Sequence, residues 1–476
     1  VYPSPNKDNG YDISDYCNIH PNYGTLQDMD TLIAEAKKRD IRIIMDLVIN
    51  HTSDQHEWFQ KSRRRIEPYT DYYIWRKGEK GKKPTNWGNF FGGDCWEYDD
   101  LRGEYYLHLF AKEQPDLNYH NEAVIEAIEE AMHFWLERGV AGFRCDVINI
   151  IYKEAIKNGK WRPALTGSEY YLSTPGCHRV LHRLHEDVLA KYDAFTVGET
   201  VFVTPKMADD LVNPAREELS TVFAFEHMET DCYKIKWFLR RFSPDRFFAC
   251  LTKWQKALPW NTVYLENHDQ PRSVSRFGND TQYHDESAKA LATLVLTLRG
   301  TPFLYEGQEI GMTNFDFSGM EKVQDVESIN IWNMGKQLHL PHSLRWRMIK
   351  TKSRDNARTP MQWNDSPNAG FTTGTPWLSV NGNYPRINVA EQENAPNSVL
   401  AYYRQLIAFR NGSEILQAGD FSELYRKDGV YAYRRSLNVE SLIVVISLST
   451  KERPNPVSGT VVLSNYGRQE SPACLS

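Results

Sequence analysis

The chain has 476 residues and a net charge of −6, a length beyond the size at which a single hydrophobic core usually stops growing. Its apolar content of 41% and charged content of 25% are typical of an ordinary globular protein rather than a disordered one. The acidic balance excludes a basic face for nucleic acid and gives no attraction to anionic lipid, so a neutral or weakly polar ligand is expected.

The cysteines and the apolar runs indicate a cellular setting. The 7 cysteines are scattered and contain no CxxC pair, so reduced thiols in a cytoplasmic protein are the simplest explanation. No stretch approaches about 18 uninterrupted apolar residues, which predicts that the chain does not span a membrane. Residues 1–5 have loop composition without a preceding element, and we expect an earlier segment to be missing from this sequence.

The first part of the chain alternates helix and strand patterns. Apolar residues at helical spacing predict a helix over 25–39, and the apolar run over 41–49 predicts a buried strand that ends at Asn50 and His51. Residues 52–118 break this alternation. They are predicted to form an inserted subdomain, because structureless loops of that length are rare.

The alternation resumes after the insert. The predicted elements are a helix over 122–137, a strand over 140–147, a helix over 178–191, strands over 194–197, 221–225 and 262–265, a helix over 287–297, a strand over 302–305 and a helix over 399–409. Segments 430–449 and 460–463 then alternate like antiparallel strands, whereas 467–476 shows no strand pattern.

Polar and charged residues follow the C-terminal ends of the predicted core strands. In a (β/α)8 barrel the active site lies at that face, and no glycine-rich phosphate loop supports the competing doubly wound sheet. The predicted fold is an α/β, (β/α)8 TIM barrel whose first strands are absent from the chain, with an inserted subdomain after the third strand and a C-terminal antiparallel β domain. The predicted domains are a catalytic barrel of residues 1–51 and 119–412, an inserted subdomain B of residues 52–118, and a C-terminal β-sandwich of residues 413–476.

Three of these strand ends deliver carboxylates, those of Asp146, Glu199 and Asp269. Glycoside hydrolysis requires two carboxylates of different strength, one to attack the anomeric carbon and one, kept protonated, to protonate the leaving oxygen. Arg144 lies two residues before Asp146 on the same strand face and would keep that carboxylate ionised. Taken alone, this pair fits a structural ion pair better, and only its place among matching strand ends favours catalysis.

Four short runs carry these residues in a fixed order. Residues 46–51, 142–146, 198–199 and 267–269 resemble the signature regions of the α-amylase family, glycoside hydrolase family 13. Runs 114–118 and 354–363 resemble further motifs of its oligo-1,6-glucosidase branch, and the resemblance extends from residue 1 to about residue 463. It implies a retaining mechanism and, through a closed pocket, exo-action on short substrates.

The resemblance also implies residue roles. Asp146 is then the nucleophile, Glu199 the general acid/base and Asp269 the transition-state stabiliser. The implied substrate-binding residues are His51, Arg144 and His268 around the cleaved sugar, Asp8 and Arg358 behind a terminal glucose with Arg354 as the alternative arginine, Tyr11 stacked on that glucose, and Phe110 on the pocket wall or in the core.

Val147 bears on which glucosidic bond, α-1,6 or α-1,4, is cleaved. A valine directly after the nucleophile resembles the α-1,6-cleaving members, whereas threonine or alanine accompanies a preference for α-1,4 bonds. On its own a β-branched residue in a strand is equally well explained by strand formation.

The expected function is hydrolysis of α-1,6-glucosidic bonds at the non-reducing end of isomalto-oligosaccharides or short dextrans. The alternatives within the family are trehalose-6-phosphate hydrolase, sucrose isomerase and α-1,4-glucosidase. A phosphorylated substrate would need a cation cluster, for which Lys77, Lys80, Lys82 and Lys83 are one candidate run, although a solvated surface explains them better. An alternative of another class is a catalytically silent member that serves as a protein partner, and retention of all three acids argues against it.

No metal ligand set or cofactor is expected, because the carboxylates and histidines lack the HExxH or CxxC spacing of zinc sites. The family often holds a calcium ion in a loop that would precede residue 1. The only expected partner is the oligosaccharide, with no nucleic acid, no membrane and a monomeric state.

Overall fold

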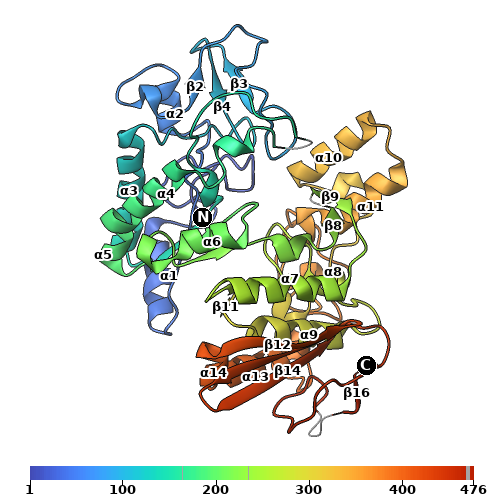
Figure 1. The fold of residues 1–476 in the computed structure, drawn as a ribbon. Coiled ribbons are helices and arrows are strands. Elements are labelled where there is room, and N and C mark those ends of the chain that lie inside the picture. The colour runs from blue at the N-terminus through green and yellow to red at the C-terminus, as the bar shows by residue number, and fades with distance from the viewer. Residues whose placement is uncertain (163–164, 234, 468–471, 476) are drawn as a thin grey trace. The chain divides into compact units, whose positions relative to one another are not determined.

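The computed structural model describes residues 1–162, 165–233, 235–467 and 472–475. The chain forms two compact units, Val1–Phe225 and Glu226–Ser476, which Figure 1 colours from blue to green and from green to red. Each unit is built around parallel strands of its own. No helix in the described part of the chain is long and apolar enough to cross a bilayer.

A four-stranded parallel sheet forms the core of the first unit. Its strands are β1 (Met45–Leu47), β5 (Gly142–Cys145), β6 (Phe195–Glu199) and β7 (Thr221–Phe223), in the order β1-β5-β6-β7. The register places Asp46 of β1 beside Arg144 of β5, and Arg144 beside Val197 of β6. Because all strands run in one direction, the polar residues at their C-terminal ends lie along one edge of the sheet.

Gly142 allows β5 to begin close to β6. Its φ of +149° lies in a region that favours glycine, and a Cβ at this position would lie 1.8 Å from the carbonyl oxygen of Phe195. Gly300 has the same role in the second unit, where a Cβ would lie 2.2 Å from the carbonyl oxygen of Asn261.

The helices of the first unit begin at side-chain caps. Asn121 accepts a hydrogen bond from the backbone of Ala123 at the start of α3, and Thr174 caps α4 with Pro175 at its first position. The α- and π-helical segments are α1 (Leu26–Lys37), α2 (Glu57–Ser62), α3 (Glu122–Glu137), α4 (Pro175–Leu184), a π-helical turn (His185–Leu189), α5 (Ala190–Tyr192) and α6 (Pro205–Val212). The helix predicted over 178–191 therefore starts earlier and is interrupted by the π turn.

A small antiparallel sheet lies within the predicted insert. Its strands β2 (Trp75–Arg76), β4 (Glu104–Leu107) and β3 (Trp96–Asp99) are arranged in the order β2-β4-β3. The guanidinium carbon of Arg102 lies 4.3 Å from the ring centre of Trp75, and its Nε donates to Glu104 Oε2 at 2.6 Å. Apolar residues of the segment pack in one cluster with Val147, Ile150 and Tyr171, so the segment is folded and is not a structureless loop.

The second unit contains two parallel strands, β10 (Thr262–Val263) and β11 (Thr301–Pro302), and the short hairpin of β8 (Cys232–Tyr233) and β9 (Ile235–Leu239). Its helices are α7 (Pro244–Ala257), α8 (Ser273–Phe277), α9 (His284–Thr297), α10 (Val326–Gln337), α11 (His342–Lys352), α12 (Val389–Glu393), α13 (Val399–Asn411) and α14 (Glu414–Ala418). Helices α9 and α13 pack on each other through Leu296, Tyr403 and Leu406. All six predicted core strands are present; five are shorter than predicted, whereas β6 extends two residues beyond its predicted end at Val197.

The chain ends in antiparallel strands. β12 (Asp420–Lys427), β13 (Val430–Leu437) and β14 (Glu440–Ser447) form one sheet in that order, drawn in red in Figure 1. β15 (Arg453–Pro454) pairs with β16 (Cys474–Leu475), where no strand was expected.

The strand predicted over 460–463 is wrong, since only Thr460 of these four residues forms a β-bridge and Val462 is exposed. Residues 468–471 and 476 of the predicted C-terminal domain lie outside the described residues.

Candidate active site

One arginine joins three carboxylates at the strand ends of the first unit. Arg144 Nη1 donates to Asp46 Oδ1 at 2.8 Å and to Asp146 Oδ1 at 2.5 Å, while Nη2 donates to Glu199 Oε2 at 2.6 Å. The three acids come from β1, from the residue after β5 and from the end of β6. Two of the predicted catalytic acids are therefore held by the same guanidinium.

Burial sets the charge state of this cluster. It raises the pKa of the Asp146 carboxyl well above its usual value, and although the Arg144 charge lowers that pKa, the charges of Glu199 and Asp46 act with burial. The expectation that Arg144 alone would keep Asp146 ionised is therefore incomplete. Burial also disfavours the charged guanidinium, but the surrounding carboxylates raise the pKa of Arg144 well above its usual value.

Val147 has a strained backbone next to the predicted nucleophile. Its φ of 35° and ψ of 39° lie in the left-handed region, where a β-branched residue is an outlier. Its N–H donates to Glu199 Oε2 at 3.3 Å, so the turn that carries the strain also positions the second acid. Such strain persists only where the surroundings hold it, and it concentrates at functional sites. The sequence pattern placed Val147 inside a strand, whereas it follows the strand end.

Three further predicted residues, Phe110, Tyr11 and Asp8, lie around His51. Its ring centre lies 5.0 Å from that of Phe110, and its Nε2 lies 3.1 Å from the carbonyl oxygen of Tyr11. Gln114 Nε2 donates to Asp8 Oδ2 and to the Tyr11 carbonyl, both at 3.3 Å. The Tyr11 hydroxyl donates to Asp46 Oδ2 at 3.0 Å, which connects this group to the Arg144 cluster. Burial lowers the pKa of His51 to about 4, so its ring is neutral at neutral pH.

A buried lysine fixes the orientation of His51. Lys153 is 2% exposed, and its Nζ donates to Asn50 Oδ1 at 2.6 Å and pairs with Asp116 at 2.6 Å. Because an ammonium only donates, Asn50 must turn its Nδ2 toward His51 Nδ1, 3.1 Å away. The proton of His51 is then on Nε2, where it can be donated. Sequence reasoning missed Lys153, because no spacing rule marks it, and assigned no role to Asp46, although Asp46 begins the run 46–51.

The remaining predicted residues form a group in the second unit. Asp269 lies 3.2 Å from His268 Nε2, 2.8 Å from Arg358 Nη2 and 3.5 Å from Arg354 Nη1. Burial would raise the pKa of Asp269, but His268 and the two arginines hold it well below its usual value.

Both candidate arginines thus contact Asp269. Arg354 also donates its Nε to Asp325 Oδ1 at 2.7 Å, whereas Arg358 donates its Nε to the His268 carbonyl at 2.9 Å. Arg358 therefore has the closer connection to the predicted sugar-binding histidine. The predicted partnership of Arg358 with Asp8 stays a prediction. Among the described residues, no group of three or more His, Cys, Asp or Glu side chains is arranged to hold a metal ion.

Comparison with known proteins identifies the family. The alpha-amylase catalytic domain matches residues 1–419, and the chain therefore belongs to the alpha-amylase family. The predicted family and its barrel fold with C-terminal antiparallel strands are confirmed.

Three known proteins illustrate the similarity. The chain is 49% identical over 463 residues to the oligo-1,6-glucosidase of Parageobacillus thermoglucosidasius, covering 95% of this chain and 82% of that protein. It superposes on the trehalose-6-phosphate hydrolase of Bacillus licheniformis with a TM-score of 0.93 at 41% identity, covering 100% and 88% of the two chains. The isomaltulose synthase of Klebsiella sp. LX3 gives a TM-score of 0.95 at 39% identity, covering 99% and 88%.

Replacing Lys153 tests the buried support of His51. We expect Lys153→Met to lower the free energy of unfolding by about 3–5 kcal/mol, because it leaves the Asp116 carboxylate buried without its cation. Urea denaturation followed by circular dichroism measures the loss. Adding Asp116→Asn should recover part of it, and Lys206→Met, which changes an exposed lysine of α6, is the matched control. Wild-type stability of Lys153→Met would contradict this account.

Proposed function

We propose that the chain is a retaining, exo-acting α-glucosidase that hydrolyses α-1,6-glucosidic bonds at the non-reducing end of isomalto-oligosaccharides or short dextrans. The observation that carries the proposal is the contact of Asp146 and Glu199 with one guanidinium, that of Arg144. Carboxylates held this close favour retention, which needs a separation of about 5 Å, over inversion, which needs room for a water between them. The similarity to an oligo-1,6-glucosidase supports the choice of linkage.

In the proposed reaction Asp146 attacks the anomeric carbon while Glu199 protonates the glycosidic oxygen. Glu199 then removes a proton from the water that releases glucose from Asp146. Arg144 contacts both acids and orients them, and the Val147 N–H adds a second contact to Glu199.

Asp269 and the histidines would stabilise the transition state. The low pKa of Asp269 keeps it ionised, so its charge can oppose the positive charge that develops on the sugar ring. Neutral His51 directs its Nε2 proton at the Tyr11 carbonyl, and its assignment to the cleaved sugar rests on the family resemblance. Asp8, Tyr11 and Arg358 are assigned to the terminal glucose by the family resemblance.

A phosphorylated substrate is less well supported. The lysine run of the insert is exposed and three of its four charges are matched by nearby acids, with Lys80 2.5 Å from Asp100, Lys82 2.5 Å from Glu79, and Lys83 paired with Asp94. These lysines therefore do not form the concentrated positive field that a phosphate site requires.

Sucrose isomerisation is a second candidate, because the fold is very similar to that of an isomaltulose synthase.

We further infer that the protein acts in the cytoplasm as a monomer. All seven cysteines are free, with Cys95, Cys145, Cys177, Cys232 and Cys250 buried, which supports a reducing compartment.

Removing either acid should abolish catalysis. Asp146→Asn and Glu199→Gln should each reduce glucose release from isomaltose by at least about a thousandfold, since one removes the nucleophile and the other the proton donor. Steady-state kinetics measures this, with Asp100→Asn, an exposed acid of the insert, as the control. Full activity in either variant would exclude the assignment.

The raised pKa of Asp146 predicts the acid limb of the activity profile. Asp146 must be ionised to attack, so kcat/KM should fall as pH decreases through a value above about 4, the ordinary pKa of an aspartate. Arg144→Lys should move this limb upward by about one unit, because one ammonium cannot contact all three carboxylates. Arg138→Lys, a surface arginine paired with Asp30, should leave it in place. A limb that stays fixed or moves to lower pH in Arg144→Lys would refute the proposed role.

Val147 should influence linkage preference. A panel of isomaltose, maltose, sucrose, trehalose and trehalose 6-phosphate should give the highest kcat/KM with isomaltose, with glucose and not an isomeric disaccharide as the product. Val147→Thr should shift the ratio of isomaltose to maltose turnover toward maltose by about tenfold. Val430→Thr, the same change in strand β13, is the control. Faster maltose hydrolysis by the wild type would overturn the choice of linkage.

A further inference from the structure

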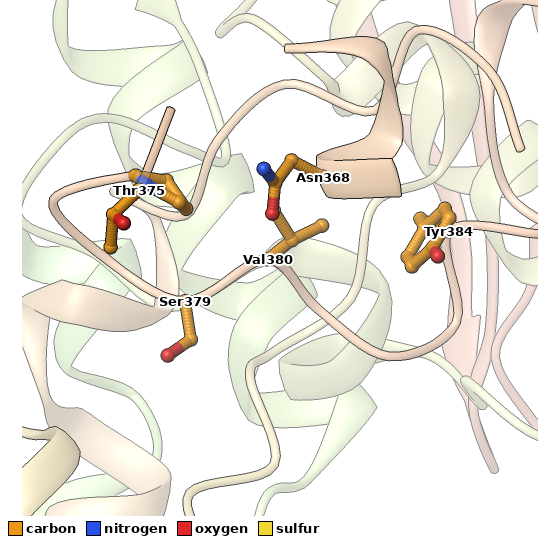
Figure 2. A pocket seen from close by; sticks show the side chains of 6 residues that line it. Asn368, Thr375, Ser379, Val380 and Tyr384 are labelled. Carbon is orange, nitrogen blue, oxygen red and sulfur yellow. The ribbon is translucent and has the colours of Figure 1, made fainter. Parts of the chain in front are cut away.

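A pocket of about 360 Å³ opens in the second unit, among residues that have no role in the proposed chemistry. Figure 2 shows side chains around it from the 3-10 turn Pro367–Gly370 and from the loop that follows. Its lining consists of Asn368, Thr375, Pro376, Ser379, Val380 and Tyr384. The volume is at the lower end of the range of small-molecule sites, about 300–1,000 Å³, which suits a ligand of limited size.

The lining selects for a neutral ligand rich in hydroxyl groups. It offers an amide, two aliphatic hydroxyls and a phenol, together with the apolar faces of Pro376 and Val380. None of these six side chains is charged, so the pocket has nothing to balance a phosphate, a carboxylate or a cation. Alternating hydroxyl groups and apolar C–H faces are the features of a sugar ring.

Exposed aromatic rings lie in the same segment. Trp363 is 48% exposed, Phe371 50% and Trp377 60%, and Trp377 directly follows Pro376 of the lining. Single exposed apolar residues are common, but three large rings in one short stretch are not accounted for by packing. Flat rings with an exposed face are suited to stacking on the C–H face of a sugar.

The turn beneath the pocket is held in a strained form. Asn368 and Ala369 have φ values of 55° and 57°, two consecutive non-glycine residues in the left-handed region. The backbone of Trp363 donates to the Ala369 carbonyl at 2.9 Å, which holds the turn. Asn368 Nδ2 donates to the carbonyls of Thr372 at 3.1 Å and Gly374 at 2.9 Å. Both amide hydrogens are thus used, and Oδ1 remains as a fixed acceptor.

A network of one buried and one half-buried amide supports the other wall. Asn381 Nδ2 donates to the carbonyls of Thr313 at 3.2 Å and Asn314 at 3.0 Å, and Asn383 Nδ2 donates to Thr313 Oγ1 at 2.7 Å. These bonds anchor the loop that carries Ser379, Val380 and Tyr384. The pocket is therefore formed before a ligand arrives, which lowers the entropy cost of binding.

We propose that this pocket is a second carbohydrate-binding site that takes one glucosyl residue of an α-linked oligosaccharide, with Trp377 as the stacking surface. A neutral sugar follows from the lining alone. The choice of a glucosyl residue rests on the proposed function, since a glucan hydrolase meets glucosyl chains.

The test uses the full chain carrying Asp146→Asn, so that the probe is not consumed. Isothermal titration with isomaltotriose should show a second binding event in addition to that at the catalytic residues, and dextran should retard the protein in affinity electrophoresis. Ser379→Trp, which fills the pocket, should abolish the second event. Trp377→Ala should weaken it by about tenfold, the loss expected for one good contact. Trp161→Ala, an 82% exposed tryptophan of the first unit, is the matched control and should change neither measurement.

A second event that persists in both Ser379→Trp and Trp377→Ala, or a single event in the parent, would overturn the proposal. If Ser379→Trp melts below the parent temperature, Tyr384→Phe, which removes one hydroxyl, provides the measurement instead, and unchanged affinity there counts against the pocket. Wild-type glucose release from isomaltose is measured in parallel. Hydrolysis with one binding event rejects the pocket alone, whereas pocket-dependent binding without hydrolysis rejects the proposed function alone.

Discussion

The contacts of the Arg144 guanidinium with three carboxylates are the interactions on which the acid cluster of the first unit depends. The Arg144 side chain is 15% exposed, it contacts carboxylates in or directly after three adjacent parallel strands, and its charge opposes the desolvation that raises the pKa of Asp146. Three acids at adjoining strand ends would repel one another in a low-dielectric site without a shared cation. Strand register and the close approach allowed by Gly142 place that cation at the required position. Chemistry and sheet geometry thus depend on the same few residues.

The second unit applies the same principle with reversed charges, as His268 and two arginines surround a single carboxylate, Asp269. Asp146, which shares one cation with two other acids, has a raised pKa. Asp269, which several cations surround, has a lowered pKa. The two predicted kinds of carboxylate, a reacting group and a permanently charged stabiliser, therefore arise from the ratio of charges around each acid rather than from the acids themselves.

Local patterns were sufficient for much of the fold. The helix over 122–137 was predicted with its observed limits, because an asparagine cap and regular apolar spacing define both of its ends. The core strands were located, but all except β6 were predicted too long, since apolar residues continue beyond the last ladder bond, as at Val48 and Ile49. Strand β12 was missed because its residues are mostly exposed and polar. Lys153 could not be predicted, because a buried lysine is recognised only by oxygen partners that are distant in sequence, here Asn50 and Asp116.

The left-handed backbone of Val147 has a consequence for how this enzyme could change its substrate. The residue that follows the nucleophile bears on linkage choice and is also held in a conformation that β-branched side chains resist. A substitution at this one position therefore changes both the substrate range and the folding stability. A replacement that relaxes the turn could free the N–H that contacts Glu199, so variants with altered linkage preference must either accept the strain or find another support for the acid. Evolution at this position is constrained by the main chain as much as by the side chain.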